Sequence, residues 1–253
     1  MKEREARPVN ENSIEGRNAV MEAFRAGRPI DKLFVLNGCQ DGAVRSIVRE
    51  AKKHSTIIQF VEKERLNQLS ETGRHQGVIA FAAAYEYSEV EDMFKLAEEK
   101  GEDPFILILD NIEDPHNLGA IIRTANLAGA HGVIIPKRRA VGLTATVAKT
   151  SAGALNYTPV AKVTNIVKTM EELKAKGMWF VCADMGGTTM YDLNLRGPIG
   201  LVIGNEGDGV SRLVRENCDF IASIPMKGDI DSLNASVAAG VLSYEIVRQR
   251  LGK

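Results

Sequence analysis

The last 150 residues of the chain alternate short apolar runs with longer segments of helical periodicity. The apolar runs lie at residues 105–109, 133–135, 179–183, 199–203 and 220–224. The helical segments lie at residues 118–129, 165–177 and 232–250. Strands that are apolar at nearly every position are typical of parallel sheets that helices cover on both faces. The pattern therefore predicts an α/β domain built on a parallel sheet over residues 104–253.

The first third of the chain alternates helix and strand on a smaller scale. Helices are predicted at 19–25, 41–54 and 63–70, and strands at 33–36, 57–61 and 77–83. Residues 12–85 are therefore expected to form a small α/β domain of the size of many RNA-binding modules, after a disordered tail at 1–11. The charged segment 87–104 reads as a helix that ends at Gly101 and Pro104, and residues 86–103 are expected to link the two domains.

Composition excludes several classes of protein. Hydrophobic residues make up 44% of the 253 residues, but no apolar run reaches the ~18 residues of a membrane span. The charged start has no apolar segment of the signal-peptide type. Cys39, Cys182 and Cys218 lie far apart, without a CxxC pair, and the four histidines show no HxxxH spacing. We therefore expect a cytoplasmic protein with neither a metal site nor disulfides, and no membrane partner.

The net charge of −1 hides a segmentation along the chain. Residues 1–85 carry 14 lysines and arginines against 11 acidic residues, and residues 104–253 carry 16 against 14. Residues 86–103 carry 2 lysines against 8 acidic residues and cancel that excess. Both predicted domains are mildly basic, which permits RNA binding through local patches. The candidate contacts are Arg17, Arg25, Arg28 and Arg74 in the first domain, and Lys137, Arg138 and Arg139 in the second.

Ligands of parallel sheets bind beyond the carboxyl ends of the strands, and the sequence after run 105–109 is rich in polar residues. It reads DPHNLGAIIRTA over residues 114–125. Asn117 is the predicted N-cap of the following helix. Arg123 stands between apolar neighbours, so we expect it to be buried and to need an anionic partner, for which a phosphate is a candidate.

Two further strand ends carry candidate chemistry. LVIGNEGDGVS, at 201–211, has glycines in GxxGxG spacing, and Glu206 at its centre would repel a pyrophosphate. It suits a cationic or hydroxyl-bearing ligand, or it is a plain turn. IPMKGDIDSLNASVAAG, at 224–240, opens a helix for which Asp231 or Ser232 is the predicted cap. The small residues that follow would let a ligand or another helix come close.

Taken together, these three stretches resemble the three motifs of the SpoU (TrmH-type) RNA 2′-O-ribose methyltransferases of the SPOUT class. IEGRNAVMEAF at 14–24 and RHQGVIA at 74–80 resemble the auxiliary domain of the RlmB-type enzymes, which methylate a guanosine of 23S rRNA. The resemblance implies a deep trefoil knot in residues 104–253 and a homodimer formed through that domain. It also implies S-adenosylmethionine as methyl donor, and 23S rRNA or a precursor of the large subunit as partner.

The resemblance also assigns the site. The donor would lie against Gly204, Asn205, Gly207, Ile224, Pro225, Met226, Leu233 and Ala235. The catalytic positions would be Asn117, Arg123, Glu206, Ser232 and Asn234. Arg123 would be the base or, since a guanidinium stays protonated, a clamp on the RNA phosphate. Asn117 would orient Arg123 or the ribose, and Glu206 would hold Arg123 or Asn117. Ser232 and Asn234 would shape the substrate side.

Several alternatives stay open on the sequence alone. Within the same chemistry, the target could be another rRNA nucleotide, the adenosine of a resistance-type enzyme, or a tRNA. In a different class, the chain could be a non-catalytic RNA-binding or ribosome-assembly protein, although it keeps all five polar motif positions. A dinucleotide-dependent oxidoreductase fits the α/β pattern but lacks GxGxxG after the first strand of the large domain.

Overall fold

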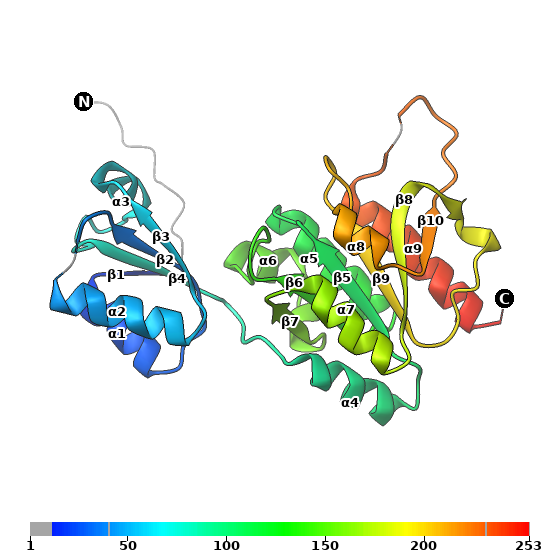
Figure 1. Ribbon diagram of the computed structural model, residues 1–253, viewed down its shortest axis with the longest axis horizontal. Helices are drawn as coiled ribbons and strands as arrows, with labels where there is room; N and C mark the ends of the chain where they lie inside the picture. Colours follow the sequence, from blue (N-terminus) through cyan, green and yellow to red (C-terminus); the bar gives the residue numbers. More distant parts are fainter. Residues whose placement is uncertain (1–11, 40, 231, 253) are drawn as a thin grey trace. The chain divides into compact units, whose positions relative to one another are not determined.

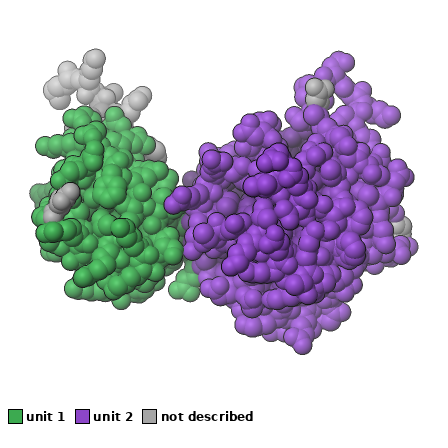
Figure 2. Space-filling model, viewed as in Figure 1, with its two compact units in different colours: residues 1–86, 142–145 green, residues 87–141, 146–253 purple. Residues whose placement is uncertain are grey.

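The computed structural model describes residues 12–39, 41–230 and 232–252. The tail predicted at 1–11 and the predicted cap Asp231 lie outside the described residues. The chain divides into two compact units (Figure 2). Unit 1 comprises residues 1–86 and 142–145, and unit 2 comprises residues 87–141 and 146–253.

Unit 1 is a four-stranded mixed sheet with helices on both faces (Figure 1). Its elements are β1 (Ser13–Glu15), α1 (Arg17–Arg25), β2 (Ile30–Leu36), α2 (Gly42–Lys53), β3 (Ile57–Val61), α3 (Lys63–Leu69) and β4 (Val78–Ala82). The strand order is β1-β4-β2-β3, with β2 and β3 parallel and β4 antiparallel to both of its neighbours. One core joins α1 and α2 to the sheet through Val20, Val35 and Val44. A smaller one on the other face places Leu66 of α3 against Phe34.

Unit 2 is built on a six-stranded parallel sheet; five of its strands coincide with the predicted apolar runs, and the sixth, Val160–Val163, was not predicted. Its elements are α4 (Val90–Lys100), β5 (Phe105–Asp110), α5 (Pro115–Leu127), β6 (Gly132–Pro136), α6 (Ala145–Thr150), η1 (Ala154–Asn156), β7 (Val160–Val163), α7 (Ile166–Ala175), β8 (Trp179–Thr189), η2 (Met190–Asp192), β9 (Ile199–Gly204), α8 (Arg212–Glu216), β10 (Phe220–Ser223) and α9 (Ala235–Arg250). The strand order is β10-β8-β9-β5-β6-β7. The trefoil knot implied by the resemblance stays a prediction, because strand order does not specify threading.

The faces of the unit 2 sheet follow from strand alternation. Ile106 and Ile108 of β5 belong to a core that includes residues of α4, α7 and α8. Leu107 and Leu109 therefore point to the opposite face. There α5 and α9 pack against each other and α9 contacts β9, and Figure 1 shows α7 and α9 on opposite sides of the sheet. The sheet is thus covered on both faces, which accounts for its continuous apolar strands.

The acidic segment predicted as a linker forms its helix but is not a free connector. Met93 and Ala97 of α4 are buried in unit 2. A Cβ at Gly132, the first residue of β6, would lie 2.4 Å from Met93 Cγ, so the absent side chain makes room for the helix. Lys176 of unit 2 forms an ion pair with Glu91 at 3.2 Å. The acidic composition belongs to one exposed face of a packed helix.

The predicted caps Asn117 and Ser232 are both wrong, because α5 begins earlier than predicted and α9 begins later. Asn117 lies inside α5, whose N-cap is Asp114, with its carboxylate accepting a hydrogen bond from the His116 N–H at 2.9 Å. Pro115 at the first helical position explains the earlier start, because its φ suits the helix and it needs no N–H partner there. In α9 the cap is Asn234, not Ser232. Its Oδ1 accepts from the N–H groups of Ser236 and Val237.

The small residues of α5 and α9 permit close packing. A Cβ at Gly119 of α5 would lie 1.8 Å from Thr150 Oγ1 of α6, so only glycine fits there. In α9, a Cβ at Gly240 would lie 3.9 Å from Thr124 Cγ2 of α5, an ordinary contact distance, so the helices are adjacent there without requiring glycine. The small-residue stretch that begins α9 therefore lies partly against a helix and, as described below, partly against a cleft.

A buried histidine anchors the amino-terminal edge of the unit 2 sheet. His131 Nδ1 accepts a hydrogen bond from the Phe105 N–H at 3.0 Å, and its Nε2 lies 3.2 Å from Glu102 Oε2. The ring is therefore neutral, with its proton on Nε2. Burial lowers the pKa of His131 below its usual value, with a smaller contribution from Lys100. Protonation of Nδ1 would break the bond to Phe105.

We predict that His131 makes the stability of the protein depend on pH. Because its folded pKa is lowered, the unfolded chain takes up the proton first as pH falls through about 6.5. Stability from the neutral ring is present above that pH and is lost below it, by up to about 1.4 kcal/mol per pH unit. Urea unfolding of His131→Gln between pH 7 and pH 5 should give a flatter profile than the unchanged protein. The exposed His116→Gln is the control, and an unchanged slope in His131→Gln contradicts the assignment.

Candidate active site

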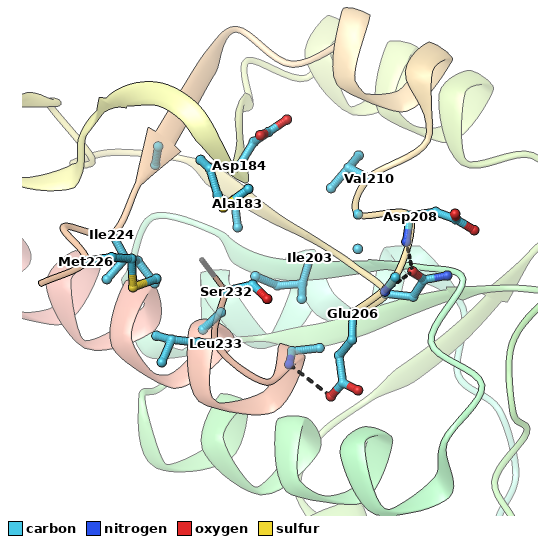
Figure 3. Close-up of a pocket in the computed structure, with 18 residues that line it drawn as sticks. Ala183, Asp184, Ile203, Glu206, Asp208, Val210, Ile224, Met226, Ser232 and Leu233 are labelled. Atoms are coloured by element: carbon cyan, nitrogen blue, oxygen red, sulfur yellow. Dashed lines mark hydrogen bonds between the residues drawn. The ribbon is translucent and has the colours of Figure 1, made fainter. Parts of the chain in front are cut away.

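One cleft opens at the carboxyl ends of β8, β9 and β10 (Figure 3). Its volume is about 340 Å³. It is lined by Ala183, Asp184, Met185, Ile203, Gly204, Asn205, Glu206, Gly207, Asp208, Gly209, Val210, Ala222, Ile224, Met226, Ser232, Leu233, Ala235 and Ala238. Seven of the eight residues predicted to contact the donor are among them, and Pro225 is not. The cleft brings together the second and third sequence motifs.

The β8 wall of the cleft was missed in the sequence. Asp184 and Met185 directly follow the apolar run 179–183, which ends at Ala183, so the rule that ligands lie beyond strand ends would have found them. Asp184 Oδ2 accepts a hydrogen bond from Arg215 Nε at 2.7 Å. Partial burial raises the pKa of Asp184, but hydrogen bonds from Arg215 and Gly186 outweigh it and leave the pKa below its ordinary value. This wall therefore presents an ionised carboxylate.

The loop after β9 is held in shape by hydrogen bonds between its backbone and the Asn205 side chain. Asn205 Oδ1 accepts hydrogen bonds from the N–H groups of Gly207 at 2.9 Å and Asp208 at 2.6 Å. Gly209 has a φ of 68°, and its carbonyl would lie 2.2 Å from a Cβ on Gly204. Gly207 has no such constraint, since the nearest atom to its Cβ would be 3.7 Å away. The loop folds back on Gly204 and leaves backbone groups along the cleft.

Three polar residues, one from each motif, meet at the rim of the cleft. Asn117 Nδ2 donates to Glu206 Oε1 at 3.0 Å, and Asn234 Nδ2 donates to Asn117 Oδ1 at 3.0 Å. Asn234 Nδ2 also donates to Glu206 Oε1, and the Ala235 N–H lies 3.4 Å from the same oxygen. Figure 3 shows Glu206 beside the first turn of α9. Of the two predicted roles for Glu206, the structure supports the one in which it holds Asn117.

Arg123 is exposed and lies outside this network, which corrects the prediction that it is buried. It borders a separate hollow of about 430 Å³ with Asn126, Leu127 and Tyr157. The prediction judged Arg123 by its sequence neighbours, but residues one or two apart do not share a helix face. The buried face of α5 is instead formed by Leu118, Ile121, Ile122 and Ala125.

The predicted RNA contacts differ in how free their side chains are. Arg17 is held within unit 1, with an ion pair to Asp41 at 2.7 Å and a hydrogen bond to the Gln76 carbonyl at 3.0 Å. Arg25 pairs with Glu22 in its own helix. The exposed candidates are Arg28, Arg74, Arg138 and Arg139, whereas Lys137 is half-buried. Arg17 therefore acts first as a structural residue.

The electrostatics of the cleft favour a cationic ligand. Asp184, Glu206 and Asp208 contribute three carboxylates to its lining, of which Asp184 is ion-paired with Arg215 outside the cleft, and no lysine or arginine is among the described lining residues. Within the described part of the chain, no group of three or more His, Cys, Asp or Glu side chains is arranged to hold a metal ion. Such a cleft suits a sulfonium ion such as S-adenosylmethionine and disfavours a pyrophosphate.

We predict that Gly204 and Gly207 differ sharply as sites of substitution. In Gly204→Ala the new methyl group meets the backbone of Gly209 and Val210, which cannot give way as a side-chain end can. The loop should shift, at a cost of about 1–3 kcal/mol in unfolding free energy. The Kd for S-adenosylmethionine, measured by calorimetry, should rise about tenfold or more. Gly207→Ala is the matched control and should bind within about threefold; equal effects would contradict the loop geometry.

Comparison with known proteins agrees with this geometry. Residues 104–244 match the model of the SpoU rRNA Methylase family, and residues 13–88 match that of RNA 2′-O ribose methyltransferase substrate binding. The putative TrmH family tRNA/rRNA methyltransferase YacO of Bacillus subtilis is 52% identical over 237 residues, which cover 93% of this chain and 94% of that protein.

Solved structures extend the likeness to the fold. The SpoU methyltransferase AviRb of Streptomyces viridochromogenes, in complex with AdoMet, has a TM-score of 0.60 at 27% identity and covers 94% of this chain and 90% of its own. The TrmH/SpoU tRNA modifying enzyme of A. aeolicus has a TM-score of 0.55 at 30% identity over 64% of this chain and 84% of its own. The chain belongs to the SpoU (TrmH-type) family of RNA methyltransferases, with S-adenosylmethionine as its methyl donor.

Proposed function

We propose that this RNA methyltransferase acts on a ribose 2′-hydroxyl, and that its target is a guanosine of 23S rRNA, free or in a large-subunit precursor. The observation that carries the proposal is the network of Asn117, Glu206 and Asn234, which joins the three motifs at the rim of the cleft. A fixed set of polar groups beside a donor cleft is what the positioning of a hydroxyl nucleophile requires.

The cleft fits S-adenosylmethionine in size and charge. Its volume of about 340 Å³ lies in the range of small-molecule sites, and its lining combines apolar side chains with the backbone of glycine-rich loops. When bound, the donor supplies an electrophilic methyl group on a cationic sulfur. The chain's own contribution is to hold that group near the rim and to exclude water with Ile203, Ile224 and Leu233.

The rim residues orient the acceptor. Glu206 fixes the amides of Asn117 and Asn234, so their rotamers are set before RNA arrives. Ser232 is exposed and lines the same cleft, where its hydroxyl can bond to the ribose. The Arg123 guanidinium acts through its positive charge: it holds the RNA phosphate and stabilises the negative charge that forms on the 2′-oxygen as the hydroxyl proton passes to solvent water.

The position of Arg123 supports a homodimer. Arg123 shares its hollow with Leu127 and Tyr157, which expose 65% and 75% of their surface. Val237 and Tyr244 of α9 are also exposed apolar or aromatic residues. Exposed side chains of this kind mark protein interfaces when they gather. In the proposed dimer, α5 and α9 form the contact, and Arg123 of one protomer approaches the cleft of its partner.

The presence of unit 1 favours rRNA over tRNA. The A. aeolicus tRNA modifying enzyme matches 64% of this chain, so more than a third of the chain has no counterpart in that match. The substrate-binding family model covers residues 13–88, which make up most of unit 1. An added substrate-binding domain suits an RNA that must be recognised at a distance from the methylated ribose.

The test uses tritium-labelled S-adenosylmethionine and RNA from cells that lack this gene. Separated large rRNA, small rRNA and tRNA would be digested after reaction, and the labelled nucleoside identified. We expect label in 2′-O-methylguanosine from the large rRNA, and none with Arg123→Ala, which should still bind the donor within about threefold. Label in tRNA or on another nucleoside would overturn the target. Bound donor without label on any naked RNA or ribosomal precursor would favour the non-catalytic RNA-binding alternative.

A further inference from the structure

Helix α2 carries three cations on one flank. Arg45, Arg49 and Lys52 are exposed and follow the spacing i, i+4, i+7, so they form a single row along the helix. The buried residues of the same helix are Val44, Ile47 and Ala51. Because successive residues advance by about 100° around the helix, Arg45 and Lys52 lie about 100° from the buried residues that precede them, Val44 and Ala51. The row therefore runs along the solvent-facing flank of the helix.

This row is not neutralised in the way that other exposed cations are. Arg25 pairs with Glu22 at 2.5 Å, Lys53 with Glu50 at 2.8 Å and Arg212 with Glu216 at 3.0 Å, each within its own helix. Among the described residues, no salt bridge joins a carboxylate to Arg45, Arg49 or Lys52. The row thus presents three like charges without a paired carboxylate.

An exposed aromatic residue lies on the neighbouring strand. Phe60 of β3 exposes 58% of its surface. It is in register with Val35, which belongs to the core beneath α1 and α2, so Phe60 points to the same face of the sheet as α2. Strand β3 is the edge of that sheet. Phe60 therefore stands at the border of unit 1 with no strand beyond it.

The crossover from β2 through α2 to β3 brings the row of cations on α2 and the ring of Phe60 to the same side of unit 1. In a right-handed crossover, the residues that directly follow the buried positions of the helix turn toward the next strand. Arg45 and Lys52 directly follow Val44 and Ala51. The row thus faces β3, and α2 contacts that strand (Figure 1).

We propose that Arg45, Arg49, Lys52 and Phe60, the α2–β3 surface, bind a single-stranded segment of the RNA substrate. The three cations would contact successive phosphates and Phe60 would stack on a base, which is the combination that single-stranded nucleic acids require. The inference rests on the proposed function in that it takes RNA as the partner. It places the contact away from Arg17 and Arg25, whose side chains are held by Asp41 and Glu22.

The charge component is tested with two triple variants of the full chain. Arg45→Gln/Arg49→Gln/Lys52→Gln removes the row. Lys53→Gln/Lys63→Gln/Arg65→Gln removes the same charge from exposed positions elsewhere in unit 1. Binding to 23S rRNA transcribed in vitro would be measured from 50 to 200 mM salt. We expect the row variant to lower the salt slope of log Kd by about 2, at about 0.7 for each lost phosphate contact, and the control to change it by less than 1.

The stacking component is tested separately. Phe60→Ala should weaken binding about tenfold without changing the salt slope, because it removes a ring and no charge. Phe60→Trp should restore the affinity, which a merely structural loss would not do. Calorimetric binding of S-adenosylmethionine, which takes place in unit 2, should be unchanged in every variant.

The outcomes separate this inference from the proposed function. If the unchanged protein neither binds nor methylates 23S rRNA, the proposed function fails and the inference fails with it. If the unchanged protein methylates the rRNA, and the row variant and Phe60→Ala match the control, only the inference is overturned. If the row variant or Phe60→Ala keeps full activity on naked rRNA but loses methylation of a ribosomal precursor, the inference is also overturned, because the α2–β3 surface would then contact a protein.

Discussion

The carboxylate of Glu206 is the point on which the geometry of the active site depends. One of its oxygens accepts hydrogen bonds from Asn117 of α5 and Asn234 at the start of α9, residues that stand 89 and 28 positions away in the chain. In the chain, Asn117 comes after strand β5, Glu206 after β9 and Asn234 after β10. Strand packing brings these parts near one another, but only the polar contacts set the side chains in a fixed relation. Asn117 is buried while Glu206 and Asn234 are exposed, and each of the three side chains is hydrogen-bonded to the other two.

The same contacts tie the site to the fold. Asn234 caps α9 with its Oδ1 while its Nδ2 reaches Glu206 and Asn117, so the start of the last helix and the rim of the cleft share one side chain. The packing of α5 against α9, with Gly240 beside Thr124, keeps Asn117 within reach. Behind the rim, Gly204 lets the loop after β9 fold back on itself. The fold positions the cleft, and the Glu206 carboxylate aligns the two asparagine side chains at its rim.

The sequence predicts the architecture well, because buried parallel strands are apolar at every position and helices recur with their own period. The cofactor loops could also be located, since ligands lie beyond strand ends. Three features escaped the sequence for physical reasons. Arg123 was judged by neighbours that point to other faces of α5. The start of α5 depends on Pro115. The cap of α9 depends on the hydrogen bonds that join Asn234 to Asn117 and Glu206, which are tertiary contacts. The acidic segment looks like a linker because its charges lie on the exposed face of α4, while Met93 and Ala97 are buried.

The central claim is that Asn117 and Asn234 act through Glu206 as one unit, and a double-mutant cycle tests it most directly. Single-turnover methylation rates would be measured for Asn117→Ala, Asn234→Ala and the double variant, with donor affinity measured in parallel. If the three residues form one network, the double variant should be no slower than the worse single variant within about threefold, because either change already breaks the network around Glu206. Rates that fall by the product of the two single effects would show that the asparagines act independently, and would contradict the account.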